Sequence, residues 1–301
     1  MRILVPVDDS AGTRRAIEFL LESEGRFGPN AEIELANVQY SVPESLIRLF
    51  GMEEVKRYYL ETGKSVFDKL AATTGVRRLG AVERVLYGDV GKCLTAEAEA
   101  FRPDLIVMGT RGLPPLEGLL LGSVSNALLA RTRAPMLLLR EGVALPAARM
   151  RVGVLVDGSE YGAAAAKFVL EHRALFGPDA ILSVVHCAEP VPYPISPMAA
   201  SPMTPVLSRE ELEAGQRSAW EENVRPILEL FEEAGVPVRS EYLQGVPDKV
   251  LPEYASAALD LVVMGSHGYG NFTAAVLGST AMHVAANCRA PVLVVRRPKT
   301  A

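Results

Sequence analysis

Two glycine-rich stretches of identical spacing are the residues best suited to chemistry in this chain. The first, Gly-Thr-Arg-Gly at residues 109–112, is followed after nine residues by Gly-Ser at 122–123. The second, Gly-Ser-His-Gly at 265–268, is followed after nine residues by Gly-Ser at 278–279. Glycines three apart let the backbone approach a ligand and direct N–H groups at it, and a helix that begins at the second pair adds its positive dipole end. Each stretch therefore predicts a cradle for phosphates.

An acidic residue ends the first apolar run of each half of the chain. Asp8 follows Ile3–Val7, and Asp157 follows a similar run. A carboxylate at a strand end can accept hydrogen bonds from sugar hydroxyls, so the pattern predicts a nucleotide with its ribose beside the aspartate. Two alternatives stay open: the glycines are structural turns, and the aspartates belong to helix N-caps with Ser10 and Ser159.

The elements that position these residues occur twice. Residues 2–10 align with 151–159 at an offset of 149, and residues 104–140 match 260–296 at 15 of 37 positions without a gap. A period near 150 residues is the size of a whole domain, which indicates a tandem duplication with expected domains 1–145 and 146–301. The extra residues of the second copy fall in the proline-rich stretch 189–208, expected to be a long loop that is either a surface insertion or a lid.

Each copy alternates short apolar runs with helical patterns. Strands that are apolar on both faces and separated by helices predict a parallel sheet covered on each side, here two tandem doubly wound α/β domains of five strands. The two fifth strands are exposed edges in isolated domains, so we expect them to pair within one chain as a pseudo-dimer. In the first copy the expected strands are Ile3–Val7, Glu32–Val38, Val82–Leu86, Leu105–Met108 and Met136–Leu139, and the expected helices are Arg14–Glu24, Ser45–Thr73, Lys92–Ala100 and Ser123–Arg131.

Composition excludes several classes of protein. With 49% apolar and 22% charged residues, the chain is too apolar to be disordered and too charged to be a membrane protein. A net charge of −5 gives no reason to expect nucleic acid or an anionic membrane as partner. Three widely spaced cysteines without a CxxC motif indicate a reducing, cytoplasmic setting. No GxGxxG, GxSxG or HExxH motif supports hydride transfer, ester hydrolysis or zinc proteolysis.

The repeated G-x2-G-x9-G-(S/T) pattern resembles the ATP-binding signature of universal stress proteins. The openings Ile-Leu-Val-Pro-Val-Asp and Val-Gly-Val-Leu-Val-Asp, the Val-His-Cys-Ala-Glu-Pro after the second strand and the closing Ala-Pro-Val-Leu-Val-Val-Arg are similar too. The likeness covers both halves. It implies a tandem-domain protein of the universal stress protein (adenine nucleotide alpha hydrolase-like) fold that binds ATP, with or without Mg²⁺ or Mn²⁺, and pairs through its fifth strands.

The resemblance also implies which residues bind the nucleotide, and it names no metal ligands. Pro114, Pro115 and Thr280 depart from the family pattern, and Asp9 stands where the second copy has Gly158, which favours the second site. The implied adenine and ribose contacts are Pro6, Val7, Asp8, Val38 and Met108 in the first copy, and Leu155, Val156, Asp157, Cys187 and Met264 in the second. The implied phosphate contacts are Gly109, Arg111, Gly112, Gly122, Ser123 and Val124, and then Gly265, His267, Gly268, Gly278, Ser279 and Thr280.

Taken together, the residues and the resemblance predict a cytoplasmic ATP-binding regulator of stress adaptation. Ligand occupancy would alter partner binding or association. We expect no catalytic residues, because phosphoryl transfer needs a base and neither cradle shows one. The alternatives are a scaffold that binds no nucleotide, and a slow ATPase or a kinase-like enzyme that acts on itself. The sequence does not say whether two chains form a homodimer.

Overall fold

The chain folds into one continuous sheet of ten strands, in the order β3-β2-β1-β4-β5-β10-β9-β6-β7-β8. The structure is a computed structural model that describes residues 1–110, 121–143, 149–189, 209–267 and 277–296. The strands are β1 (Arg2–Val7), β2 (Glu32–Gln39), β3 (Val82–Tyr87), β4 (Leu105–Thr110), β5 (Met136–Arg140), β6 (Arg151–Leu155), β7 (Ile181–Ala188), β8 (Arg239–Gln244), β9 (Leu261–Gly265) and β10 (Val292–Val295).

Helices cover both faces of this sheet. Residues of α1, α3, α6 and α8 pack in one hydrophobic cluster, and residues of α4, α5, α9 and α10 pack in a second. The helices are α1 (Ala11–Glu22), α2 (Glu44–Phe50), α3 (Met52–Thr73), α4 (Val90–Phe101), α5 (Ser123–Arg131), α6 (Glu160–Glu171), α7 (Arg173–Phe176), α8 (Arg209–Glu233), α9 (Pro247–Ala258) and α10 (Ser279–Asn287).

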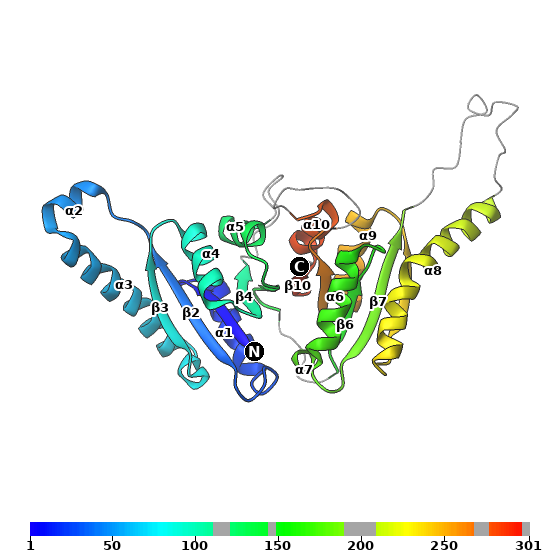
Figure 1. Cartoon of the computed structure of the whole chain (residues 1–301), viewed down its shortest axis with the longest axis horizontal. Helices are drawn as coiled ribbons and strands as arrows, with labels where there is room; N and C mark the ends of the chain where they lie inside the picture. Colours follow the sequence, from blue (N-terminus) through cyan, green and yellow to red (C-terminus); the bar gives the residue numbers. More distant parts are fainter. Residues whose placement is uncertain (111–120, 144–148, 190–208, 268–276, 297–301) are drawn as a thin grey trace, which may run out of the picture.

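The two halves of the sheet meet at their fifth strands, as expected from the sequence. β10 runs antiparallel to β5, with Val292 opposite Leu138 and Val294 opposite Met136, whereas the other ladders are parallel. Figure 1 shows the halves as two wings, with α2 and α3 at one outer end and α8 at the other. The predicted α/β class and parallel strands are confirmed.

Two local features differ from the sequence-based expectation. The helical stretch expected over 45–73 is interrupted at Gly51, whose positive φ of 82° separates α2 from α3. A short 3-10 helix at Val76–Leu79 was not expected. The proline-rich stretch, apart from Glu189, lies outside the described residues, and so do Pro114 and Pro115.

Pro6 is the second-last residue of β1, an inner strand of the sheet. The β1–β4 ladder stops at the Leu4–Ile106 pair, whereas the β6–β9 ladder continues to Leu155–Met264. Because proline has no N–H to donate, the pairing of β1 with β4 ends two residues earlier than the pairing of β6 with β9. The strand ends are therefore not identical in the two halves.

Candidate functional site

The ends of β6 and β9 lie side by side in the second half. Leu155 pairs with Met264, and the chain then continues into Val156 and Asp157. The Val156 N–H donates to the Val185 carbonyl at 2.9 Å. Nδ1 of the buried His186 lies 2.8 Å from the Val156 carbonyl oxygen. These contacts fix the backbone that presents the Asp157 side chain at the sheet's carboxyl edge.

Asp157 also supports the start of α6. Its Oδ1 accepts from the Ser159 N–H at 3.0 Å and from the Ser159 hydroxyl at 2.5 Å. Ser159 is the N-cap of α6 and accepts from the Gly162 N–H. The N-cap role left open by the sequence is therefore present. Within the described part of the chain the other oxygen, Oδ2, makes no hydrogen bond, so a ligand hydroxyl can still use it.

Helix α10 presents its N-terminus to the same space. Its N-cap is Gly278, which supplies no side-chain acceptor, and the Gly278 N–H donates to the Ser266 carbonyl at 2.9 Å. The first turn of a helix has N–H groups without intrahelical partners, together with the positive end of the helix dipole. Ser279 and Thr280 thus stand where an anion is stabilised.

A cavity of about 270 Å³ joins these features. One part of its wall is apolar and the other contains the α10 N-terminus and the Asp157 side chain. It is lined by Leu155, Val156, Asp157, Gly162, Cys187, Pro247, Leu251, Met264, Gly265, His267, Gly278, Ser279, Thr280, Ala281 and Val284.

The structure brings the residues implied for the second site around this one cavity, apart from Gly268, which lies outside the described residues. Sequence reasoning missed five lining residues, Gly162 on α6, Pro247 and Leu251 on α9, and Ala281 and Val284 on α10. The α9 residues lack a motif of their own, and only the packing of α9 on α10 brings them to the site.

Helix α9 also supplies an acid that the sequence did not reveal. Asp248 Oδ1 accepts from the Thr280 hydroxyl at 2.8 Å, and Oδ2 lies 3.3 Å from His283 Nδ1. That His283 nitrogen is also 2.9 Å from the Ser279 carbonyl oxygen. Asp248 is not among the residues that line the cavity, and it contacts the site through Thr280.

The first half places its implied residues on the equivalent elements. Pro6 and Val7 end β1, Val38 is near the end of β2, and Met108 and Gly109 are near the end of β4. Gly122 is the N-cap of α5, which begins with Ser123 and Val124. Arg111 and Gly112 lie outside the described residues.

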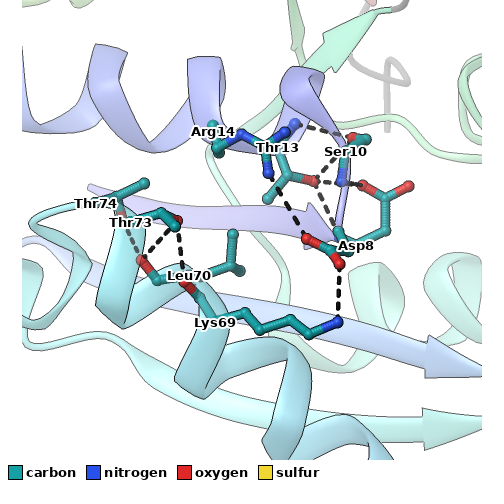
Figure 2. Close-up of polar contacts among 9 residues, drawn as sticks. Asp8, Ser10, Thr13, Arg14, Lys69, Leu70, Thr73 and Thr74 are labelled. Atoms are coloured by element: carbon teal, nitrogen blue, oxygen red, sulfur yellow. Dashed lines mark hydrogen bonds and ion pairs between the residues drawn. The ribbon is translucent and has the colours of Figure 1, made fainter.

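Asp8 has different partners from Asp157. Its Oδ1 accepts from the Thr13 hydroxyl at 2.6 Å and from the Ser10 N–H at 3.1 Å, while its own N–H donates to Thr13 Oγ1. Figure 2 shows this network at the start of α1. Beside it, Asp9 contacts Lys69 Nζ at 3.0 Å and Arg14 Nη1 at 3.6 Å. The second half has Gly158 at the Asp9 position and Gly162 at the Thr13 position, so its strand end carries fewer side chains.

Comparison with known proteins identifies the family. The sequence profile described as the universal stress protein family matches residues 1–140 and again residues 148–296. The chain belongs to the universal stress protein family. A universal stress protein of Mycolicibacterium smegmatis is 30% identical over 98% of this chain and 96% of its own length. One from Thermus aquaticus is 34% identical over 97% of its own length but only 46% of this chain. The crystal structure of a universal stress protein from Archaeoglobus fulgidus superimposes with a TM-score of 0.69 at 22% identity, covering 99% of this chain and 98% of that one.

The first glycine of each signature in this universal stress protein is required by packing. A Cβ at Gly265 would lie 2.5 Å from Tyr161 Cβ and 2.6 Å from the Tyr161 backbone. A Cβ at Gly109 would lie 1.9 Å from the Gly12 carbonyl oxygen. Helices α1 and α6 thus approach the strand ends so closely that only glycine fits. Gly109 and Gly265 therefore have a structural role, which does not depend on a bound ligand.

The remaining polar chemistry of the site is limited. Burial raises the pKa of the Cys187 thiol to about 11, with a smaller contribution from the Glu189 charge. Among the residues that the structure describes, no three His, Cys, Asp or Glu side chains are grouped to hold a metal ion.

Over the same described ranges, no helix combines the length and the apolar character needed to cross a membrane.

Proposed function

We propose that this universal stress protein is a cytoplasmic regulator that binds ATP in the second-half cavity and, by the same arrangement, at the first-half strand ends. The observation that carries the proposal is the convergence of Asp157, the apolar β6 end and the uncapped α10 N-terminus on one cavity. This combination suits a ligand with an apolar base, a hydroxylated sugar and phosphates. The residues present fit such a group.

The regulatory part of the proposal follows from where the sites lie. Strands β9 and β10 are adjacent, and β10 pairs with β5 of the other half. A ligand bound at the end of β9 is therefore separated from the seam between the halves by β10 alone. We propose domains 1–145 and 146–301, with ligand occupancy changing how partners recognise the paired halves. The three free cysteines fit a reducing compartment.

Substitution of Asp157 by asparagine tests nucleotide binding. Asparagine keeps an oxygen that can accept from Ser159, so the α6 cap survives, but it removes the charge and replaces the second acceptor with a donor. We expect ATP affinity at the second site to fall about tenfold, with an unchanged melting temperature. Isothermal titration calorimetry with ATP on the whole chain measures the first, and thermal denaturation measures the second.

Ser159→Ala is the matched control. It removes the N-cap oxygen of α6 and one of the two hydrogen bonds to Asp157 Oδ1 but keeps the Asp157 charge, so it should lower stability by about 1 kcal/mol and weaken ATP binding less than Asp157→Asn does. Wild-type protein that takes up no ATP would overturn the proposal and leave the scaffold interpretation. Equal ATP affinities for wild type and Asp157→Asn would remove Asp157 from the site.

A further inference from the structure

A second cavity lies between the two halves of the chain. It has a volume of about 660 Å³, and both halves contribute to its wall. The first half supplies the ends of α4 and α5 with the residues that follow them, and the second half supplies the end of α6 through Phe168 and His172. Helix α5 begins at the first cradle and α6 begins beside Asp157, so the length of a helix separates this cavity from each cradle.

Three guanidiniums and an imidazole line this cavity. Arg102 is the C-cap of α4, Arg131 is the last residue of α5, and Arg133 lies between α5 and β5. Two carboxylates, those of Glu99 and Asp104, are in the same wall, and Asp104 already accepts from a backbone N–H at 2.7 Å. The wall therefore carries an excess of positive charge.

The protein does not use these guanidiniums for its own contacts. Within the part of the chain that the structure describes, the side chains of Arg102, Arg131 and Arg133 make no hydrogen bond or ion pair. Arg140 differs, because its guanidinium donates to carbonyl groups at the end of α10. Burial lowers the pKa of Arg296, and the nearby positive charge of Arg133 lowers that pKa further. The donors of this cavity are thus free to bind a ligand, and their charge is not neutralised.

The equivalent helix ends of the other copy lack this set of cations. Asn287 at the end of α10 corresponds to Arg131, and Ser23 at the end of α1 corresponds to His172. Helix α9 ends in Ala258, without a cation in its last turn. The helix dipole favours cations at helix C-termini, but it does so equally in both copies. Helix capping therefore does not explain why the cations gather on one cavity.

The wall combines these cations with an apolar surface. Pro103, Pro135 and the buried Phe168 also line the cavity. Guanidinium groups bind carboxylates and phosphates through two parallel hydrogen bonds, whereas the apolar side chains suit the carbon body of an organic molecule. A volume of about 660 Å³ is within the range of small-molecule sites in proteins. The combination fits an organic anion of small size.

We propose that this cavity binds a small organic anion with at least two carboxylate or phosphate groups. Arg102, Arg131 and Arg133 bind the charged groups, and Phe168 packs against the organic body. Because the ligand contacts α4 and α5 of one half and α6 of the other, its binding stabilises the pairing of the halves. The inference is independent of ATP binding.

Isothermal titration calorimetry of the whole chain tests this site, with citrate and inorganic pyrophosphate as probes at millimolar concentration and low ionic strength. Citrate presents carboxylates and pyrophosphate presents phosphates, so the two titrations show which group the cavity prefers. We expect Arg133→Gln and Arg102→Gln each to weaken binding of the preferred probe about tenfold, because each removes a charged donor pair. Both arginines are exposed, and circular dichroism checks that the variants stay folded.

Arg289→Gln is the matched control, because Arg289 corresponds to Arg133 in the second half and is also exposed. It should bind both probes as wild type does, and so should Asp157→Asn at this cavity. Pyrophosphate can also enter the cradles, so its binding here is the difference between wild type and Arg133→Gln.

Three results would overturn the inference. The first is wild type that binds neither probe, and the second is equal affinity in Arg133→Gln and Arg289→Gln. The third is binding that Asp157→Asn weakens and Arg133→Gln does not, which assigns the anion to the nucleotide cavity. A chain that fails to bind ATP but binds citrate through Arg133 refutes the proposed function alone.

Discussion

At the scale of single residues, equivalent side chains of the two halves of the candidate site make different contacts. Asp157 and Asp8 are equivalent in sequence, but the hydroxyl that donates to Asp8 is that of Thr13, whereas the hydroxyl that donates to Asp157 is that of Ser159. His186 and Asn37 are also equivalent, and each contacts the carbonyl at the end of the first strand of its half. The sequence predicted the aspartates because they end apolar runs. It could not predict Asp248, because its partner Thr280 is 32 residues away and only the packing of α9 on α10 joins them.

Cys187 provides a prediction at this scale. The thiolate is the reactive form of cysteine, and burial raises the Cys187 pKa from the ordinary value of 9.0 to about 11. A raised pKa means that less thiolate is present at any lower pH, so at pH 8 the reactive fraction is about a hundredfold below that of an ordinary thiol. Alkylation by iodoacetamide should therefore be slow at pH 8 and should still rise above pH 10. Peptide mapping by mass spectrometry measures the rate at Cys187, and a rate that levels off below pH 9 would contradict this assignment.

At the scale of elements, hydrophobic periodicity predicted most of the first-half strands and helices to within a few residues. Ser123–Arg131 is the same in prediction and structure. The failures have local causes. The break at Gly51 falls inside an apolar, helical pattern that periodicity alone cannot interrupt, and the 3-10 helix at Val76–Leu79 is too short to produce a period. For the site, residue spacing predicted the strand ends and the α10 N-terminus, but not the α9 residues that close the cavity.

The approach of α6 to β9 gives a prediction about elements. Gly265→Ala should destabilise the protein by about 1 to 3 kcal/mol, because the new methyl group must displace the Tyr161 backbone rather than a mobile side-chain end. Urea denaturation measures the loss. Gly215→Ala is the matched control, since Gly215 is on the exposed face of α8 with nothing within 4 Å of a new Cβ. It should stabilise the protein by up to about 1 kcal/mol through helix propensity. Equal effects at the two positions would show that α6 moves aside without cost.

At the scale of the whole molecule, the antiparallel β5–β10 pair removes the exposed edge that each half would otherwise have. A polar contact from the first half reinforces this seam. Arg140, the last residue of β5, donates from Nη2 to the Ala285 carbonyl at 2.8 Å and also to the Ala286 carbonyl in the last turn of α10. A cation at a helix C-terminus is also favoured by the helix dipole. Arg140 therefore ties the first half to a helix of the second.

Arg296 is the counterpart of Arg140 after β10, and the pair yields the last prediction. Its Nε and Nη2 are buried and have no hydrogen-bond partner within the described part of the chain. Burial lowers the pKa of both guanidiniums, so each charge is costly unless its donors are satisfied. Arg140→Met should destabilise the protein by about 1.5 to 3 kcal/mol, because it removes charged hydrogen bonds to two carbonyl groups. Arg296→Met should leave stability unchanged or raise it, because it replaces an unsatisfied buried charge with an apolar side chain of similar length. Urea denaturation of both variants measures the difference. A larger loss for Arg296→Met than for Arg140→Met would mean that the seam is held from the second half rather than the first.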